Sequence, residues 1–436
     1  MSNEICFQRN IPIACNVDVC VVGGGPAGIA AAVSAARNGA SVFLGESSGC
    51  FGGLGTLGLV PAFCGVGNGK IFLGGRICRE VFDAMEIPPG ELTREFSYIN
   101  VERLKCVYDS MISASGVKFA LESKMISVKM QNGIVEAALF SDDGDYGLFA
   151  VKAKVFIDGT GNGDLAARAG ADYTQGNAAG IPMPSTLCSL WSSVNWEKFN
   201  REKPNVFQLL MKAIDDGIFK VPDRHHSGMF PVGADCAGGN FSHVFGMRAN
   251  DREQKTAAWI ELRQQLQEYQ FFYNNYVPGF ETAHLCMTAP MLGIRECRRI
   301  TGDYVLTLDD FKKRSRFADE IGEFAYPVDI HPLDSSVAEF ERFTRDFYGN
   351  LRYRAGESYG IPYRVLVPQK LKNVLTAGRC VSTDQPMAAS IRVMPGCFLT
   401  GQAAGTAAAL ASAGCNGMVR DISIAELQKR INYGKA

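Results

Sequence analysis

Several features that would mark a specialised chain are missing from these 436 residues. The charges nearly cancel, with 44 Lys and Arg against 45 Asp and Glu, so the chain lacks the basic excess that nucleic acids and anionic membranes attract. The longest uncharged run, 393–419, contains five glycines and several polar residues, unlike a membrane-spanning helix. We therefore expect neither nucleic acid nor a membrane as a partner.

Metal-binding and disulfide patterns are also missing. None of the fourteen cysteines forms a C-x-x-C pair, and the histidines share no metal-like spacing with them, so we assign no role to His225, His226, His243 or His284. The residues before Val17 are too polar for a secretory signal. These absences predict reduced thiols, no metal site and a cytoplasmic location.

Glycine, in contrast, is abundant. The 47 glycines cluster in short loops between apolar runs, a pattern expected where backbone packs against a ligand. The length fits two domains. Residues 1–175 and 361–436 share short apolar strands and small-residue helices, whereas 176–360 has more aromatics and charge. We predict one discontinuous domain from the two outer segments and a second, substrate-binding domain from 176–360.

Apolar periodicity predicts the regular elements. Strands are expected at 17–22, 40–44, 117–120, 125–130, 135–140, 151–157 and 372–378, and helices at 26–38, 99–115, 252–273 and 400–413. The first strand, first helix and second strand make a βαβ unit.

A glycine-rich turn joins that first strand to its helix. Gly23, Gly25 and Gly28 form G-x-G-x-x-G: Gly23 permits the tight turn, Gly25 lets the backbone approach a pyrophosphate, and Gly28 lets the helix pack against the strand. The free amides at the helix start, around Pro26 and Ala27, face the phosphates. This order of elements predicts a dinucleotide site.

Glu46 ends the second strand, where its carboxylate can accept hydrogen bonds from ribose hydroxyls, and Ser47 follows it. The N-terminal motif does not by itself separate FAD from NAD. The discrimination has to come from later parts of the chain.

Three later motifs favour FAD over NAD: CFGGLGT at 50–56, VFIDGTGNGDLAARAGA at 155–171, and LTAGRCVSTDQPMAASIRVMPGCFLTGQAAGTAAALA at 375–411. With the N-terminal motif they resemble the FAD-dependent oxidoreductases of the glutathione reductase and fumarate reductase type, in particular a bacterial branch with a C-terminal AGR-x-x-S motif. The resemblance covers 17–65, 155–171 and 290–410 and leaves most of 174–282 unplaced.

The resemblance implies an α/β fold: a Rossmann-like FAD-binding domain of three layers (ββα) with an inserted α+β substrate domain. It implies FAD as cofactor and transfer of hydride or electrons between flavin N5 and a small organic substrate. It also implies further cofactor contacts at Gly52, Gly53, Asp158, Gly159, Thr160, Gly161, Asp164, Gly378, Arg379, Thr400, Gly401 and Gln402.

Two of these motifs leave choices open. Asp164 can satisfy the first-turn amides of the helix that it begins, or it can contact the cofactor. A helix start at Thr400 would aim its dipole at the flavin ring, with Arg392 nearby.

Cys50 lacks the close partner cysteine that disulfide reductases have in this loop, since the next cysteine is Cys64. The loop therefore does not favour disulfide reductase activity.

The segment PMLGIRECRRITGDYVLTLDD, 290–310, supplies the first catalytic candidate. As a strand it would place Arg295, Cys297 and Arg299 on one face, with Glu296 and Arg298 on the other. An arginine beside a closed flavin pocket needs a partner, either a substrate oxygen or Glu296 in a structural ion pair. Both readings stay open for Arg295.

The segment YPVDIHP, 326–332, supplies the second catalytic candidate, His331. Asp329 and His331 point the same way in an extended chain, so that the aspartate can orient a histidine that moves a proton. A purely structural role is the alternative. Arg295, His331 and Arg392 are thus the predicted catalytic residues.

Two other functions compete with an FAD-dependent oxidoreductase: an NAD-dependent dehydrogenase and a flavin-binding protein without catalysis. No second G-x-G-x-x-G follows its own strand, so a separate nicotinamide domain is not expected. Electrons would then pass between the flavin and the substrate, oxygen or a redox partner protein.

Overall fold

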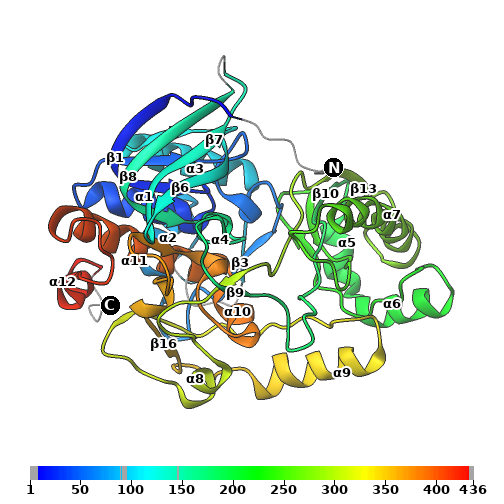
Figure 1. Ribbon diagram of the computed structural model, residues 1–436. Helices are drawn as coiled ribbons and strands as arrows, with labels where there is room; N and C mark the ends of the chain where they lie inside the picture. The colour runs from blue at the N-terminus through cyan, green and yellow to red at the C-terminus, as the bar shows by residue number, and fades with distance from the viewer. Residues whose placement is uncertain (1–7, 89, 91–95, 145–146, 432–436) are drawn as a thin grey trace.

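The computed structural model describes residues 8–88, 90, 96–144 and 147–431 (Figure 1). Its main sheet contains, in spatial order, β5 (Lys118–Ala120), β2 (Val42–Gly45), β1 (Ile13–Val22), β8 (Leu148–Asp158), β7 (Ile134–Ser141) and β6 (Lys124–Gln131), with β17 (Val374–Thr376) also beside β8. Strands β5, β2, β1, β8 and β17 run parallel, whereas β8, β7 and β6 pair antiparallel.

Residues 19–22 of β1 are buried on both faces, which explains why this part of the strand is apolar throughout, whereas Asn16 and Asp18 lie in its less buried first part. Val19 and Val21 pack in one hydrophobic cluster with α1 (Pro26–Arg37). Cys20 and Val22 pack in another with Phe140 of β7. The helices, the parallel strands and the antiparallel strands therefore form the three layers expected for a Rossmann-like flavoprotein.

A second sheet and its helices form a separate hydrophobic cluster, in green in Figure 1. The sheet is antiparallel in the order β11 (Gly228–Pro231), β12 (Ala237–Asn240), β10 (Ser189–Ser192) and β13 (His284–Thr288), and the helices are α5 (Trp196–Glu202), α6 (Val206–Asp215) and α7 (Arg252–Tyr276). Trp191 and Phe272 are fully buried there. This unit is the observed α+β part of the chain.

The remaining elements connect and cover these two units. They are β3 (Ala62–Cys64), α2 (Gly75–Ala84), β4 (Phe96–Tyr98), α3 (Val101–Ala114), α4 (Asp164–Arg168), β9 (Tyr173–Thr174), β14 (Arg299–Ile300), α8 (Leu308–Lys313), β15 (Glu320–Phe324), α9 (Val337–Arg345), β16 (Tyr359–Pro362), α10 (Gln385–Ile391), α11 (Met394–Gly414) and α12 (Ile424–Arg430). Phe324, Tyr359 and Ile361 pack in the same cluster as α1 and α11. The division at 175 and 360 stays a prediction.

Helix α11 lies against α1 at backbone contact. A Cβ atom on Gly401 would lie 2.1 Å from the carbonyl oxygen of Ala27, and one on Gly405 would lie 2.0 Å from that of Ala31. These glycines are one helical turn apart and share the contact face. The small-residue sequence of α11 is therefore a packing requirement, and it brings the C-terminal segment onto the first βαβ unit.

Two local predictions are wrong. Helix α11 begins at Met394 instead of Thr400, because Pro395 lies in the first turn, where no backbone N–H is needed. Residues 295–298 are not a strand: Glu296 accepts hydrogen bonds from the amides of Gly176 and Met183 and pairs with Arg299, which the strand prediction placed on the opposite face. The other predicted strands and helices are present with shifts at their ends.

The contact between α1 and α11 gives a stability prediction. Gly405→Ala should lower the free energy of unfolding by about 1–3 kcal/mol, because the added methyl group collides with the Ala31 carbonyl. Gly414→Ala in the same helix, where a Cβ meets no atom within 4 Å, should change it by less than about 1 kcal/mol. Urea unfolding of both variants measures the difference. Equal stability would show that the two helices can separate at no cost.

Candidate cofactor and substrate site

Of the three glycines in the G-x-G-x-x-G motif, local structure requires two and the third faces open space. Gly23 has a φ of +94°, and a Cβ on Gly28 would lie 1.7 Å from the Gly23 carbonyl oxygen. A Cβ on Gly25 would meet no atom within 4 Å, although Gly25 lines a large cavity. Gly25 thus leaves the room that a pyrophosphate needs beside the start of α1.

Glu46, directly after β2, closes this loop. Its carboxylate accepts hydrogen bonds from the amides of Gly24 at 2.6 Å and Ser48 at 2.9 Å. The side chain is buried, yet Glu46 and Ser47 both line the cavity. Glu46 therefore fixes the loop at the edge of the cavity, and its contact with a ribose stays a prediction.

A second turn, after β8, meets the first. The Asp158 carboxylate accepts hydrogen bonds from the Thr160 amide and hydroxyl and from the Ala166 amide of α4, and burial raises its pKa. The Thr160 hydroxyl accepts one from the Asp164 amide at 2.9 Å. Of the two roles left open for Asp164, capping of this helix is not observed, because Thr160 and Asp158 accept the hydrogen bonds from the helix amides. Asp164 instead pairs with Arg298 at 2.8 Å and lines the cavity.

The C-terminal motif forms a third part of the cavity wall, directly beside these turns: a Cβ on Gly378 would lie 2.9 Å from Cβ of Ala27. The Gly378 amide donates to the Thr400 hydroxyl at 3.0 Å, and Gln402 accepts from the Ile77 amide at 3.0 Å. Arg379 is held by the carbonyl oxygen of Ile294, and burial lowers its pKa. Because α11 begins at Met394, its first turn, and not Thr400, reaches the cavity.

All these walls enclose one cavity of about 1180 Å³. It exceeds the roughly 300–1,000 Å³ typical of small-ligand pockets, so it has room for a dinucleotide and a substrate. The predicted site residues that line it are Gly23, Gly25, Pro26, Ala27, Glu46, Ser47, Gly53, Gly159, Thr160, Gly161, Asp164, Arg295, His331, Gly378, Arg379 and Arg392. Six others lie behind its wall and position these residues: Gly28, Gly52, Asp158, Thr400, Gly401 and Gln402.

Arg295 lies in the part of this cavity that the second unit contributes. It is 8% exposed, and one guanidinium nitrogen donates to the Pro184 carbonyl at 2.9 Å and the Thr186 hydroxyl at 2.5 Å. Among the described residues, no carboxylate lies within 4.0 Å of it. Burial, with Arg392 as a second cause, lowers the pKa of Arg295 to about 10. Glu296, its predicted alternative partner, is paired with Arg299 instead.

Asp329 and His331 lie on the same side of their loop, as predicted. His331 Nε2 is 3.4 Å from the Asp329 carboxylate, which also pairs with Arg392 at 3.0 Å. Burial, followed by the charge of Arg295, lowers the pKa of His331 well below its usual value. The imidazole is therefore neutral at pH 7.

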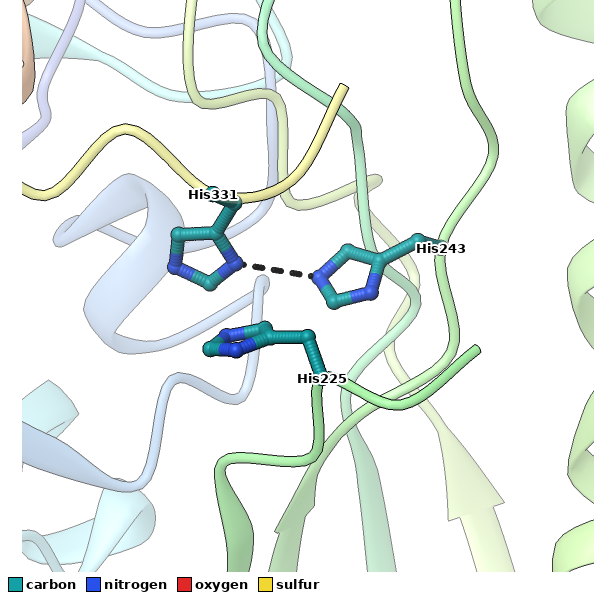
Figure 2. Close-up of side chains that lie close together, drawn as sticks. All are labelled: His225, His243 and His331. Atoms are coloured by element: carbon teal, nitrogen blue, oxygen red, sulfur yellow. Dashed lines mark hydrogen bonds between the residues drawn. The ribbon is translucent and has the colours of Figure 1, made fainter. Parts of the chain in front are cut away.

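Two histidines given no role from the sequence lie beside His331 (Figure 2). His243 Nε2 is 3.1 Å from His331 Nδ1, and the ring of His225 lies 4.3 Å from that of His331, centroid to centroid. His243 and His331 are 88 residues apart. No local spacing could have signalled this cluster, because three separate loops contribute one histidine each.

A strand, glycine loop and helix beside a cavity of this size define a dinucleotide-binding protein. The FAD dependent oxidoreductase family matches residues 18–431, so the chain belongs to that family. It is an FAD-dependent oxidoreductase, and the match decides against the NAD-dependent dehydrogenase. A search of curated proteins finds no relative.

Solved structures with a similar chain trace include several flavoproteins. A geranylgeranyl bacteriochlorophyll reductase-like protein from Thermoplasma acidophilum is 13% identical, with a TM-score of 0.48 over 96% of this chain and 83% of that one. GidA of Aquifex aeolicus is 15% identical, with a TM-score of 0.48 over 92% and 64%. The myxobacterial chondrochloren halogenase CndH is 12% identical, with a TM-score of 0.45 over 95% and 78%.

None of the helices in the described part of the chain is both long and apolar enough to cross a lipid bilayer.

Gly25 gives a test of the cofactor cradle. Gly25→Ala should weaken FAD binding about tenfold or more without lowering the melting temperature of the cofactor-free protein, because the methyl group meets no protein atom but enters the cavity. Gly49→Ala, whose Cβ would have only an ordinary contact at 3.5 Å, is the control and should bind FAD normally. Fluorescence titration with FAD measures both. An unchanged affinity of the Gly25 variant for FAD would show that the pyrophosphate does not bind beside this loop.

Proposed function

We propose that this oxidoreductase oxidises or reduces a small organic anion that Arg295 holds beside the flavin. FAD supplies a ring nitrogen, N5, that accepts or gives up a hydride. In this proposal the glycine loop, Glu46 and Ser47 bind the nucleotide end, while Gly53, Thr160, Gly161, Gly378 and Arg379 line the path to the flavin.

The observation that carries the proposal is that Arg295 is buried and has no charged partner among the described residues. A buried charge without a partner costs several kcal/mol, so proteins retain such a charge where a ligand supplies the opposite charge. Arg295 lines the same cavity as the nucleotide cradle, and only uncharged oxygens contact it among the described residues. A substrate carboxylate, or a carbonyl oxygen that becomes anionic, would complete the ion pair.

The remaining predicted catalytic residues line the same part of the cavity. Arg392 is held by Asp329, and both line the cavity with Val393 and Met394 at the start of α11. The neutral imidazole of His331 can accept a proton from the substrate as the hydride leaves. The first turn of α11 would stabilise negative charge on the reduced flavin.

The source or destination of the electrons is a further part of the proposal. We expect a second substrate, oxygen or a redox partner protein, since only one G-x-G-x-x-G motif follows its own strand. The cytoplasmic location stays a prediction.

The absorbance spectrum of the purified protein tests the central claim. A yellow chromophore should bleach with anaerobic dithionite and be released as FAD by acid. Because substrate turnover requires a reactive N5, sulfite should also bleach it. A bound flavin that reacts with neither sulfite nor oxygen after reduction would favour the flavin-binding protein without catalysis.

Arg295→Met tests the anion site. Small carboxylates such as pyruvate, succinate and benzoate should perturb the flavin spectrum of the wild-type holoenzyme, and the variant should bind them about 100-fold more weakly. The variant should keep its FAD and its melting temperature, since it loses a buried charge that has no partner.

Two other arginine variants serve as controls for this test. Arg201→Met removes an exposed charge and should change neither carboxylate binding nor stability. Arg299→Met should destabilise the protein by about 3–5 kcal/mol, because it leaves the Glu296 carboxylate buried without its ion-pair partner. If none of the carboxylates perturbs the flavin, or if Arg295→Met binds them normally, the anion site is wrong.

A further inference from the structure

Three buried histidines from separate loops lie close together (Figure 2), and two of them, His225 and His331, line the cavity. His225 precedes β11, His243 follows β12, and His331 lies between β15 and α9. One ring nitrogen from each lies within 4.8 Å of the others. The three side chains are 7%, 1% and 5% exposed, so bulk water does not separate them.

The hydrogen bond to Asp223 leaves a free lone pair on one of these rings. His243 Nδ1 is 2.6 Å from the Asp223 carboxylate, which only accepts hydrogen bonds, so a neutral His243 carries its proton on Nδ1 and has an unprotonated Nε2. This Nε2 atom lies 3.1 Å from His331 Nδ1, along the dashed line in Figure 2. His331 Nε2 is 3.4 Å from the Asp329 carboxylate.

A metal ion bound by both nitrogens is an alternative to a hydrogen bond between them. Two nitrogen ligands at about 2.0–2.1 Å from one metal ion lie about 2.8–3.4 Å apart for angles between octahedral and tetrahedral, so the separation of 3.1 Å fits. Carboxylates that accept the far N–H of a ligating histidine are also the usual surroundings of such sites.

His225 provides the third ligand and an independent observation. Its Nε2 atom is buried and has no hydrogen-bond partner among the described residues. A buried polar atom left in this state costs about 1–3 kcal/mol. Its ring lies against that of His331, with the centroids 4.3 Å apart, and a ligand shared with the other two rings would satisfy it.

We propose that His225, His243 and His331 bind a divalent transition-metal ion, with Asp223 and Asp329 orienting two of the rings. Imidazole ligands suit zinc, iron, copper and nickel. His225 and His331 line the cavity, so the remaining coordination positions of the ion are open to it. This site goes beyond flavin chemistry, and it gives His331 a ligand role in place of the proton transfer proposed above.

The proposed metal site and Arg295 lie at the same cavity, which suggests a role for the metal in binding the substrate. Arg295 is among the charges that act on all three histidines and lines the same cavity. If Arg295 holds the substrate anion, which rests on the proposed function, the metal would bind a second oxygen of the same molecule. A substrate with two neighbouring oxygens, such as a 2-hydroxy or 2-oxo acid, would contact both.

Zinc binding to the chelator-treated holoenzyme tests the site. Calorimetric titration with Zn²⁺, and metal analysis after gel filtration, should give about one ion per chain in the wild type. His225→Leu should bind Zn²⁺ at least about 100-fold more weakly while keeping its FAD, because it removes a ligand but no hydrogen bond. His284→Leu, a histidine variant at an exposed position of β13, is the matched control and should bind like the wild type.

Asp223→Asn is a second variant that keeps the side-chain shape, and it should weaken Zn²⁺ binding about 10–100-fold. The melting temperature of metal-free His225→Leu should not fall, since Nε2 has no partner to lose. Equal Zn²⁺ binding by the wild type and His225→Leu, or none by the wild type, would overturn the metal site. The flavin spectrum is a separate readout: Zn²⁺ binding by a protein without redox-active flavin would support the metal site and overturn the proposed function.

Discussion

The close packing of α11 on α1 is the constraint on which the rest of the structure depends. Two glycines, Gly401 and Gly405, bring the α11 backbone against the carbonyl groups of Ala27 and Ala31. This contact joins the C-terminal segment to the N-terminal βαβ unit. It thereby places Gly378, Arg392 and the first turn of α11 around the cavity that the glycine loop opens. A larger side chain at either glycine would move one wall away from the other.

The same cavity combines two chemically different surroundings. Around the glycine loops, backbone amides and small residues leave space for a phosphate chain. Where the second unit closes the cavity, buried Arg295, Asp329 and the three histidines, together with half-buried Arg392, concentrate charge and metal-ligating nitrogen in a water-poor environment. Electrostatic interactions are stronger there than in water, so a bound anion or cation is held firmly. Cofactor and substrate are thus recognised by different physical means within one continuous space.

Buried polar groups separate structural from functional residues in this chain. Arg299 and Glu296 satisfy one another and the surrounding amides, so they hold the fold together. Arg295 has only neutral partners, and His225 Nε2 has none among the described residues. A buried polar group without a partner lowers the stability of the fold, and proteins retain such groups where a ligand supplies the partner. This difference, and not the type of residue, points to Arg295 and His225.

The sequence by itself determined the local parts of this protein. The alternation of apolar residues, the glycine loop at 23–28 and the acid at Glu46 act over a few residues, so the βαβ unit and its dinucleotide site could be predicted. The start of α11 at Met394 follows from a local signal, Pro395 in its first turn, which the prediction of a start at Thr400 missed. A local signal failed at Glu296, because the distant amides of Gly176 and Met183 bind its side chain and no strand forms there. Only the tertiary structure could bring His225 and His243 to His331, because these histidines come from three loops whose positions depend on two separate cores.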